Sequence, residues 1–350
     1  MPNDAARSPP PDDMSPMPGE FALIARYFAP LAQDFPGAAG LRDDVAVIAP
    51  AEGCELVLKS DAIVAGVDFP PDEAAGLVAR KALRVNLSDL AAKGARPRAY
   101  MLDLILPDSV RESWIAAFAA GLARDQAEYG VHLIGGDMSS TAGPIVIAVT
   151  AIGEAPAGNI VRRGGARDGD AVFLTGTIGD SALGLAVLQQ RLQAPDDAMA
   201  AFLIDRYRLP RPRVAFGPLL IGIATAAIDV SDGLVADLHH LGEVGRLDAV
   251  LEAARLPLSA AARAMVAADP GLLATILTGG DDYEILFAAP PTRAGEIAAL
   301  AAALGLPLTA IGRLAKPAAG AAPRVTVIDE AGRPLALRAE GWSHFGGAGG

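Results

Sequence analysis

Short acidic motifs recur along most of this chain, each where an expected strand or helix ends or bends. They are Arg42-Asp43-Asp44, Ser60-Asp61, Asn86-Leu87-Ser88-Asp89, Gly135-Gly136-Asp137, Asp229-Val230-Ser231-Asp232-Gly233 and Gly279-Gly280-Asp281-Asp282-Tyr283-Glu284. Mg²⁺ prefers oxygen ligands and keeps several of its waters, so aspartates beside small residues suit it. One loop aspartate usually marks only a turn or a helix cap. Six such places beside strand-like segments predict carboxylates that converge on metal-bound phosphates.

Length and composition allow more than one hydrophobic core. The chain has 350 residues, of which 52% are hydrophobic, and this length is comfortable for two domains. No uninterrupted apolar run reaches the roughly 18–20 residues of a membrane span, so no membrane partner is expected. The Pro- and Asp-rich segment 1–18 lacks a basic start followed by an apolar stretch. We expect it to be a disordered tail rather than a signal peptide.

The charge and the cysteine content exclude several functions. A net charge of −12 argues against a nucleic-acid surface, which needs clustered Lys and Arg. An acidic chain that handles phosphates must screen them with metal ions, which agrees with the Mg²⁺ hypothesis. Cys54 is the only cysteine, so an intrachain disulfide and a Cys-based zinc site are impossible. A reducing cytoplasm is the simplest location.

Strands and helices alternate along the chain, which predicts an α/β class, or α+β if the sheets are antiparallel. Apolar spacing and turn residues predict helices over 20–33, 72–93, 111–129 and 180–191, and from 233 onward. Strands are predicted over 56–58, 99–106, 131–134, 145–152, 171–174, 226–230 and 283–288. The Gly- and Arg-containing stretch 154–170 is expected to be a hinge. It would separate an N-terminal domain (19–155) from a C-terminal α/β domain (156–350).

Five aspartates are the candidate metal ligands, and each alone could also be a cap or turn residue. They are Asp44, Asp61, Asp89, Asp137 and Asp229. Asp89 lies inside an expected helix, where Asp is unfavourable, and its alternative role is on a solvated helix face. It shares a helix face with Asn86 and Lys93. Asp232 could be the N-cap before Gly233, although its pairing with Asp229 makes capping alone a poor explanation.

Established phosphate-binding motifs are missing from the sequence. It contains no Gly-x-x-x-x-Gly-Lys-Ser/Thr loop and neither His-Arg-Asp nor Asp-Phe-Gly. Phosphoryl transfer would therefore depend on metals and on positioning. The turn 176–181 could cradle a phosphate at a helix N-terminus, although any tight strand-to-helix turn favours Gly. Arg163 could hold ATP phosphates or be an ordinary surface residue. Trp342 could stack on a flat ligand, but its type and place favour docking of the chain end.

Together, these motifs resemble those of the thiamine-monophosphate kinase family, in the aminoimidazole-ribonucleotide-synthetase-like superfamily. The resemblance runs from Gly19-Glu20-Phe21 to Gly341-Trp342-Ser343-His344-Phe345, with the motifs in the family's order and spacing. It implies direct transfer of the γ-phosphoryl group of ATP to thiamine monophosphate, with several Mg²⁺ ions and no enzyme nucleophile. It also implies a two-domain synthetase-like fold and a homodimer in which the N-terminal sheets of two subunits pair.

The resemblance also implies roles for individual residues. The implied metal-binding residues are Asp44, Lys59, Ser60, Asp61, Asp89, Asp137, Asp229 and Asp232. The implied ATP-binding residues are Tyr129, Gly136, Asp137, Arg163 and Ser231. The implied substrate-binding residues are Asp68, Asp281 and Trp342. No side chain is implied to act as a catalytic nucleophile, acid or base.

Four departures from the family pattern concern the substrate side. Arg42 replaces a Gly, Asp68 replaces a His, Met138-Ser139-Ser140 follow the Gly-Asp pair, and Asp281 replaces a Glu. None removes a metal carboxylate. Two alternatives stay open. One is another enzyme of the superfamily: aminoimidazole ribonucleotide synthetase, selenophosphate synthetase or a carbamoyl-dehydratase maturation factor. The other is a catalytically silent ATP-binding protein.

Overall fold

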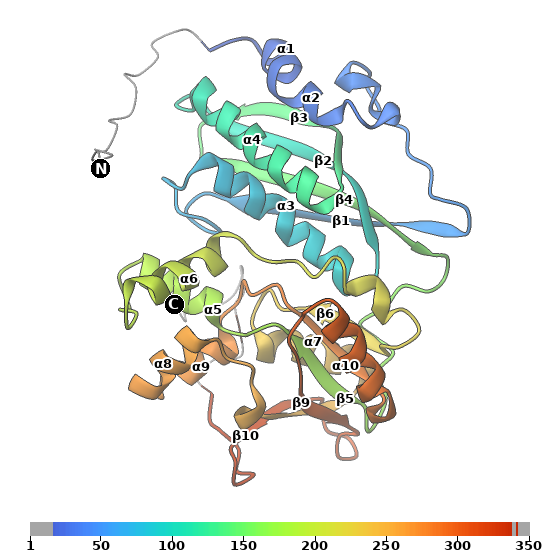
Figure 1. The fold of residues 1–350 in the computed structure, drawn as a ribbon, viewed down its shortest axis with the longest axis vertical. Helices are drawn as coiled ribbons and strands as arrows, with labels where there is room; N and C mark the ends of the chain where they lie inside the picture. Colours follow the sequence, from blue (N-terminus) through green and yellow to red (C-terminus); the bar gives the residue numbers. More distant parts are fainter. Residues whose placement is uncertain (1–16, 338–340, 342–350) are drawn as a thin grey trace.

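Two sheets with their helices form two halves that lie one above the other (Figure 1). The computed structural model describes residues 17–337 and residue 341. The first sheet has four strands and the second has six, and most neighbouring strands are antiparallel. The mixed α+β alternative is therefore the one that the chain adopts.

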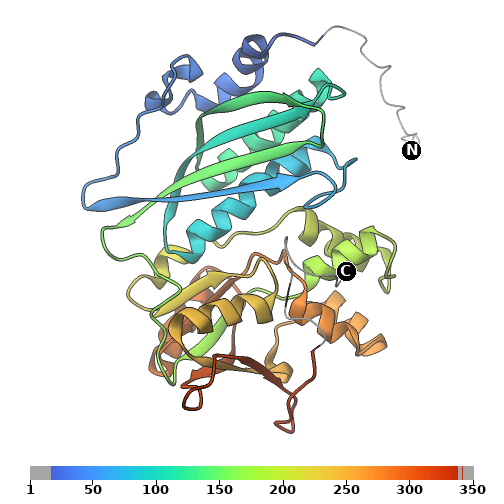
Figure 2. The same cartoon turned by 180° about the vertical axis from the view of Figure 1, so that it is seen from behind.

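The N-terminal sheet carries its helices on one face only. Its strand order is β1-β4-β2-β3, and only β2 and β3 are parallel. The elements are β1 (Cys54–Val64), α3 (Ala75–Ala92), β2 (Arg96–Pro107), α4 (Glu112–Tyr129), β3 (His132–Thr141) and β4 (Val146–Pro156). Helices α3 and α4 cover one face. On the other face, which faces the viewer in Figure 2, residues 35–48 pack on Ala99, Ile134 and Ile152, and no described element covers the rest. That open face exposes Leu58 and Met101.

The segment before this sheet is helical, as predicted, but it is not one continuous α-helix. It consists of α1 (Glu20–Leu23), a π-helical turn (Ile24–Phe28) and α2 (Ala29–Ala32). Pro30 follows the turn and has no backbone N–H, so the regular pattern of i→i−4 bonds cannot continue there. A 3₁₀ stretch (Pro36–Leu41) then leads into the exposed loop that carries Asp43 and Asp44.

The C-terminal sheet is covered on both faces. Its order is β10-β7-β9-β5-β8-β6, and every residue of β8 and β6 is buried. The strands are β5 (Ala171–Thr175), β6 (Ala226–Asp229), β7 (Asp248–Glu252), β8 (Ile285–Ala289), β9 (Leu308–Ala315) and β10 (Val325–Ile328). The helices are α5 (Asp180–Leu188), α6 (Asp197–Arg208), α7 (Leu234–Gly245), α8 (Ala260–Ala268), α9 (Leu272–Thr278) and α10 (Ala294–Ala303). None of the described helices is long and apolar enough to cross a membrane.

Helix α3 belongs to the cores of both halves. Its first turns pack in the core under the N-terminal sheet, whereas Ala91 and Ala92 pack with Phe216 and Phe287 of the second half. The approach is close, because a Cβ added at Gly217 would lie 2.1 Å from the carbonyl oxygen of Ala91. Side chains on one helix can therefore contact both halves.

Several strands are longer than the sequence predicted, which changes the position of two acidic motifs. Asp61 lies inside β1, where it pairs with Val149, and Asp137 lies inside β3. Gly136 has a φ of 145°, and an added Cβ would lie 1.8 Å from the carbonyl oxygen of Leu102. The prediction that these motifs end their strands is wrong, because pairing with a neighbour continues a strand through polar residues. The motif at Asp229 does end β6, and the motif 279–284 lies between the end of α9 and the start of β8.

Candidate functional site

A cavity of about 570 Å³ between the two halves collects half of the predicted site residues. Its walls come from β1, α3, α5, α9 and the loops that follow β6 and α9. The predicted residues that line it are Lys59, Asp61, Asp68, Asp89, Arg163, Ser231, Asp232 and Asp281. They come from both halves, so the packing of the halves creates the site.

One end of this cavity holds carboxylates around an ammonium group. Lys59 Nζ lies 2.9 Å from Asp61 Oδ2 and 3.0 Å from Asp89 Oδ2. The backbone N–H of Asp61 donates to Asn86 Oδ1 at 3.0 Å, which ties β1 to α3. Side chains alternate along a strand, so Ser60 points to the open face, with its Oγ 3.0 Å from that of Thr150. Lys59 and Asp61 thus face the cavity, and the side chain of Ser60 does not.

The carboxylates at this end are incompletely neutralised. Burial and the negative charge of Asp229 raise the pKa of Asp89 to about 7, and Lys59 offsets only part of this. Burial also raises the pKa of Asp229, whose Oδ2 has no hydrogen-bond partner among the residues that the structure describes. Leaving a buried carboxylate oxygen without a donor is costly, and a bound cation would remove that cost. Oxygen donors of this kind suit a hard cation, although the side chains of Asp61, Asp89 and Asp229 are not close enough together in this structure to hold one ion between them.

Asp44 and Asp137 form a second, separate acidic group. With Gly136 they line a pocket of about 160 Å³ beside β3. Strands β1 and β3 are the two edges of the sheet, so three strand spacings, roughly 14 Å, separate them. Within residues 17–337 no three Asp, Glu, His or Cys side chains are close enough to hold one metal ion. The predicted convergence of all five aspartates is not seen in this structure.

Two predicted ligand-binding residues lie outside the cavity or outside the described chain. Tyr129 lines another pocket, where the guanidinium carbon of Arg84 lies 5.2 Å from the centre of its ring. Trp342 is not among the described residues, although its neighbour Gly341 lines the cavity. The structure therefore does not bring Tyr129 to the other predicted ATP-binding residues.

Asp68, which replaces the usual His, uses its carboxylate within its own turn. Asp68 Oδ2 accepts a hydrogen bond from the backbone N–H of Val64 at 2.7 Å, and the N–H of Asp68 donates back to the Val64 carbonyl at 2.9 Å. This reciprocal pair of hydrogen bonds closes the turn 64–68. The residue still lines the cavity, but one carboxylate oxygen is committed to the backbone.

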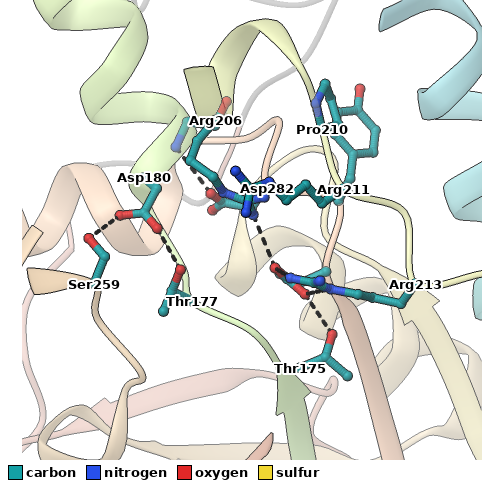
Figure 3. A network of polar contacts seen from close by, with 12 residues as sticks. Thr175, Thr177, Asp180, Arg206, Pro210, Arg211, Arg213, Ser259 and Asp282 are labelled. Atoms are coloured by element: carbon teal, nitrogen blue, oxygen red, sulfur yellow. Dashed lines mark hydrogen bonds and ion pairs between the residues drawn. The ribbon is translucent and has the colours of Figure 1, made fainter. Parts of the chain in front are cut away.

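The turn 176–181 does not offer its amides to a phosphate. The backbone N–H groups of Gly179 and Ser181 donate to the buried carboxylate of Asp282 at 2.7 and 3.2 Å. Asp180 accepts hydrogen bonds from Thr177 and Ser259, as Figure 3 shows. Because a carboxylate already caps α5, the phosphate-binding hypothesis for this turn is wrong.

Each of the residues 281–284 is held by a different part of the protein. Asp281 Oδ2 bonds to Lys81 Nζ at 2.9 Å, and Asp282 caps α5. Glu284 is fully buried and accepts from Arg206 Nη2 at 3.0 Å and from Arg213 Nε at 2.6 Å. Thr175 Oγ1 donates to Glu284 at 2.7 Å, and Figure 3 shows the two arginines and the threonine converging. Hydrogen bonds from several elements therefore hold this loop, of which Asp281 and Tyr283 line the cavity.

Asp237 is a positioning residue that the sequence analysis missed. Its Oδ2 accepts hydrogen bonds from the backbone N–H groups of Ser231, Asp232 and Gly233 at 2.9, 3.0 and 3.2 Å. Burial raises the pKa of Asp237 to about 8. An acidic residue in the first turn of a helix is the available signal, because the unpaired N–H groups there attract a carboxylate.

Comparison with known proteins identifies the family. Models of the AIR synthase related protein match at residues 42–155 for the N-terminal domain and 167–322 for the C-terminal domain. The thiamine-monophosphate kinase of Caulobacter vibrioides is 42% identical over 298 residues, which is 84% of each chain. That of Escherichia coli K12 is 40% identical and covers 93% of this chain and 98% of the relative. The chain belongs to the thiamine-monophosphate kinase family.

Solved structures agree with membership of this family. A thiamine-monophosphate kinase from Stenotrophomonas maltophilia has a TM-score of 0.74 at 39% identity, covering 81% of this chain and 89% of that one. A ThiL protein complexed with AMPPCP and TMP has a TM-score of 0.73 at 30% identity, with coverage of 93% and 97%. The hydrogenase maturation protein HypE also has a TM-score of 0.73, over 91% of this chain and 94% of that one, but is 20% identical, so it shares only the fold.

Proposed function

We propose that this protein transfers the γ-phosphoryl group of ATP to thiamine monophosphate, making thiamine diphosphate and ADP. The observation that carries the proposal is the cavity between the two halves. Asp61 and Asp89, which are candidate metal ligands, and Asp281, a candidate substrate contact, line the same cavity. Membership of the family and a solved relative with an ATP analogue and TMP support both substrates. A phosphate oxygen of the acceptor attacks the γ-phosphorus in line while the bond to the β-phosphate oxygen breaks.

Direct transfer needs positioning and charge neutralisation more than it needs a reactive side chain. The proposed mechanism therefore assigns no enzyme nucleophile. Arg163 and Ser231 are the proposed contacts for ATP, and Asp68 and Asp281 are proposed for the acceptor. Asp237 holds the loop of Ser231 through three backbone hydrogen bonds. Tyr129 and Trp342 stay predictions from the resemblance.

Asp61, Asp89 and Asp229 are the proposed ligands for Mg²⁺, with Asp232 as an accessory ligand. The unpartnered Oδ2 of Asp229 and the raised pKa of Asp89 support this set. When bound, Mg²⁺ would neutralise the negative charge of the reacting phosphoryl oxygens. Lys59 holds Asp61 and Asp89 together by its two ion pairs and keeps both side chains directed into the cavity.

The remaining implied metal and ATP ligands lie outside this acidic cluster. Asp44, Gly136 and Asp137 are proposed to bind metal and ATP phosphates as a second group at the edge of the N-terminal sheet. Their shared pocket supports this grouping. Lys59 and Ser60 would contribute through the backbone of β1, since the side chain of Ser60 faces away from the cavity.

A turnover assay tests the function. The purified chain is mixed with ATP, MgCl₂ and thiamine monophosphate, and thiamine diphosphate is measured by chromatography. We expect product that depends on both ATP and Mg²⁺. Binding of ATP without thiamine diphosphate formation would overturn the proposal and favour a silent ATP-binding protein or another enzyme of the superfamily.

A homodimer through the open face of the N-terminal sheet is also proposed. Leu58 and Met101 are 64% and 39% exposed on a face that residues 35–48 cover only in part. Covering apolar side chains with a second copy would remove them from water. Leu58→Asp should therefore convert the dimer into a monomer in analytical ultracentrifugation. Val244→Asp, at an exposed apolar residue on α7, is the matched control and should leave the dimer intact; equal behaviour of both variants would contradict the proposed interface.

A further inference from the structure

Lys81 is a buried lysine on α3 whose ammonium group contacts three residues of the cavity wall. Its side chain is 4% exposed. Its Nζ donates to Asp281 Oδ2 and to the backbone carbonyl of Asp68, both at 2.9 Å, and lies 3.8 Å from the centre of the Tyr207 ring. A buried ammonium group is costly unless it has partners, and here two oxygen acceptors and the face of one aromatic ring surround it. Asp68, Tyr207 and Asp281 all line the cavity.

The loop that Lys81 contacts has an unusual backbone. Asp281 and Tyr283 have φ values of 68° and 52°, in the left-handed region that L-residues other than Asn and Asp rarely adopt. Such a backbone persists only where the surroundings hold it. Two backbone hydrogen bonds, from Asp281 to Ser231 and from Tyr283 to Val230, hold it from within the C-terminal half. The Lys81 side chain holds it from the N-terminal half.

Helix α3 connects this contact to the proposed metal ligands. Lys81, Val85 and Asp89 recur at intervals of four residues on one face, and Val85 and Asp89 line the same cavity. Eight residues of α-helix span about 12 Å. A single rigid element therefore sets the distance between the Asp89 end of the cavity and the loop of Asp281.

We propose that Lys81 is a positioning residue. It fixes the end of the cavity near Asp68 and Asp281 (the acceptor end) relative to the end near Asp61, Asp89 and Asp229 (the metal end). By holding Asp281 and the Asp68 turn on α3, it aligns the acceptor phosphate with the γ-phosphoryl group. It also balances the charge of Asp281, so the cavity wall presents a neutral ion pair to the acceptor. The inference rests on the proposed kinase function. Its expected effect is large, because a displacement of about 1 Å at the reacting atoms can cost about a hundredfold in rate.

Lys81→Met and Lys81→Arg are the test variants. Lys81→Met removes the ammonium group, and Lys81→Arg keeps the charge but replaces a compact donor by a planar fork. In both variants we expect KM for thiamine monophosphate to rise by about tenfold or more and kcat to fall. A change of about tenfold is typical of the coupling energy between residues in direct contact, as Lys81 and Asp281 are. The Kd for the ATP analogue AMPPCP, measured by calorimetry, should change by less than about twofold, because Lys81 contacts only the acceptor wall.

Arg208→Met is the matched control. Arg208 Nε pairs with Glu73 Oε2 at 2.6 Å and also joins the two halves, but neither residue is among those described as lining the cavity. This variant should keep both kinetic constants within about twofold of the wild type.

The possible outcomes separate the two proposals. A wild-type protein that makes no thiamine diphosphate overturns the kinase function and this inference with it. An active wild type with Lys81→Met indistinguishable from Arg208→Met overturns the role of Lys81 alone. Wild-type kinetic constants in Lys81→Arg would show that the positive charge alone is sufficient. That result would also overturn the proposal that Lys81 acts by positioning. If Lys81→Met does not fold, the Lys81→Arg kinetics decide the question.

Discussion

The two ends of the cavity differ in how completely the protein supplies partners for their carboxylates. At the metal end, Asp229 Oδ2 has no hydrogen-bond partner in the described chain, and the pKa of Asp89 is raised to about 7. At the acceptor end, the three acidic side chains of loop 281–284 all accept hydrogen bonds from the protein. Buried charges without partners are costly and persist where a ligand supplies the missing partner. The metal end is therefore suited to bind a cation, whereas the hydrogen bonds at the acceptor end hold loop 281–284 in a fixed conformation.

This contrast predicts that substitutions at the two ends affect different properties. At the metal end, turnover should fall while stability is kept, because the native carboxylates repel one another. At the acceptor end, stability should fall, because removing one partner leaves buried charges unpaired. The following three experiments test the contrast, beginning with the largest effect.

Asp89→Asn should lower kcat by about a thousandfold or more, which corresponds to roughly 4 kcal/mol of lost transition-state stabilisation. The neutral amide removes a proposed metal ligand, but it also removes a buried charge, so the urea midpoint should not fall. Steady-state kinetics with saturating ATP and Mg²⁺, together with urea denaturation, measure both quantities. An unchanged turnover would refute the metal role of Asp89.

Glu284→Gln should lower the free energy of unfolding by about 3–5 kcal/mol, because buried Arg206 and partly buried Arg213 lose their counter-charge. Urea denaturation measures the change. Glu296→Gln is the control, since Glu296 pairs with Arg293 at the surface and its removal should change stability little. Similar small changes in both variants would show that the acceptor end does not depend on its buried ion pairs.

Mg²⁺ should stabilise the wild-type protein against unfolding, by about 2.7 kcal/mol at a concentration one hundred times its Kd. The cation supplies the partner that Asp229 Oδ2 lacks. Thermal unfolding with and without MgCl₂, in the absence of nucleotide, measures the effect, and Asp89→Asn should show a smaller shift. An equal shift in the two proteins would place the bound ion elsewhere.

Much of the fold could be predicted from local patterns. Helix α4 was predicted as 111–129 and is observed at Glu112–Tyr129, because Gly130 adopts the left-handed conformation that ends it. Helix α3 was also predicted within three residues at each end. The strands of the N-terminal sheet were predicted too short, because pairing with a neighbouring strand, rather than side-chain type, decides where they end. The Ala-rich helix α10 was not predicted, since its sequence shows little contrast between its faces.

The sequence by itself determined the chemistry and the family, because residue types and their order along the chain carry both. It indicated oxygen ligands, phosphate chemistry without a P-loop, and a match to one kinase family. Only the tertiary structure decided which acidic residues meet. Asp61 and Asp89 share an ammonium partner, whereas Asp137 lies beside the opposite edge of the sheet. Lys81 and Asp281 are 200 residues apart and meet only because the two halves pack on the same helix, which no local pattern encodes.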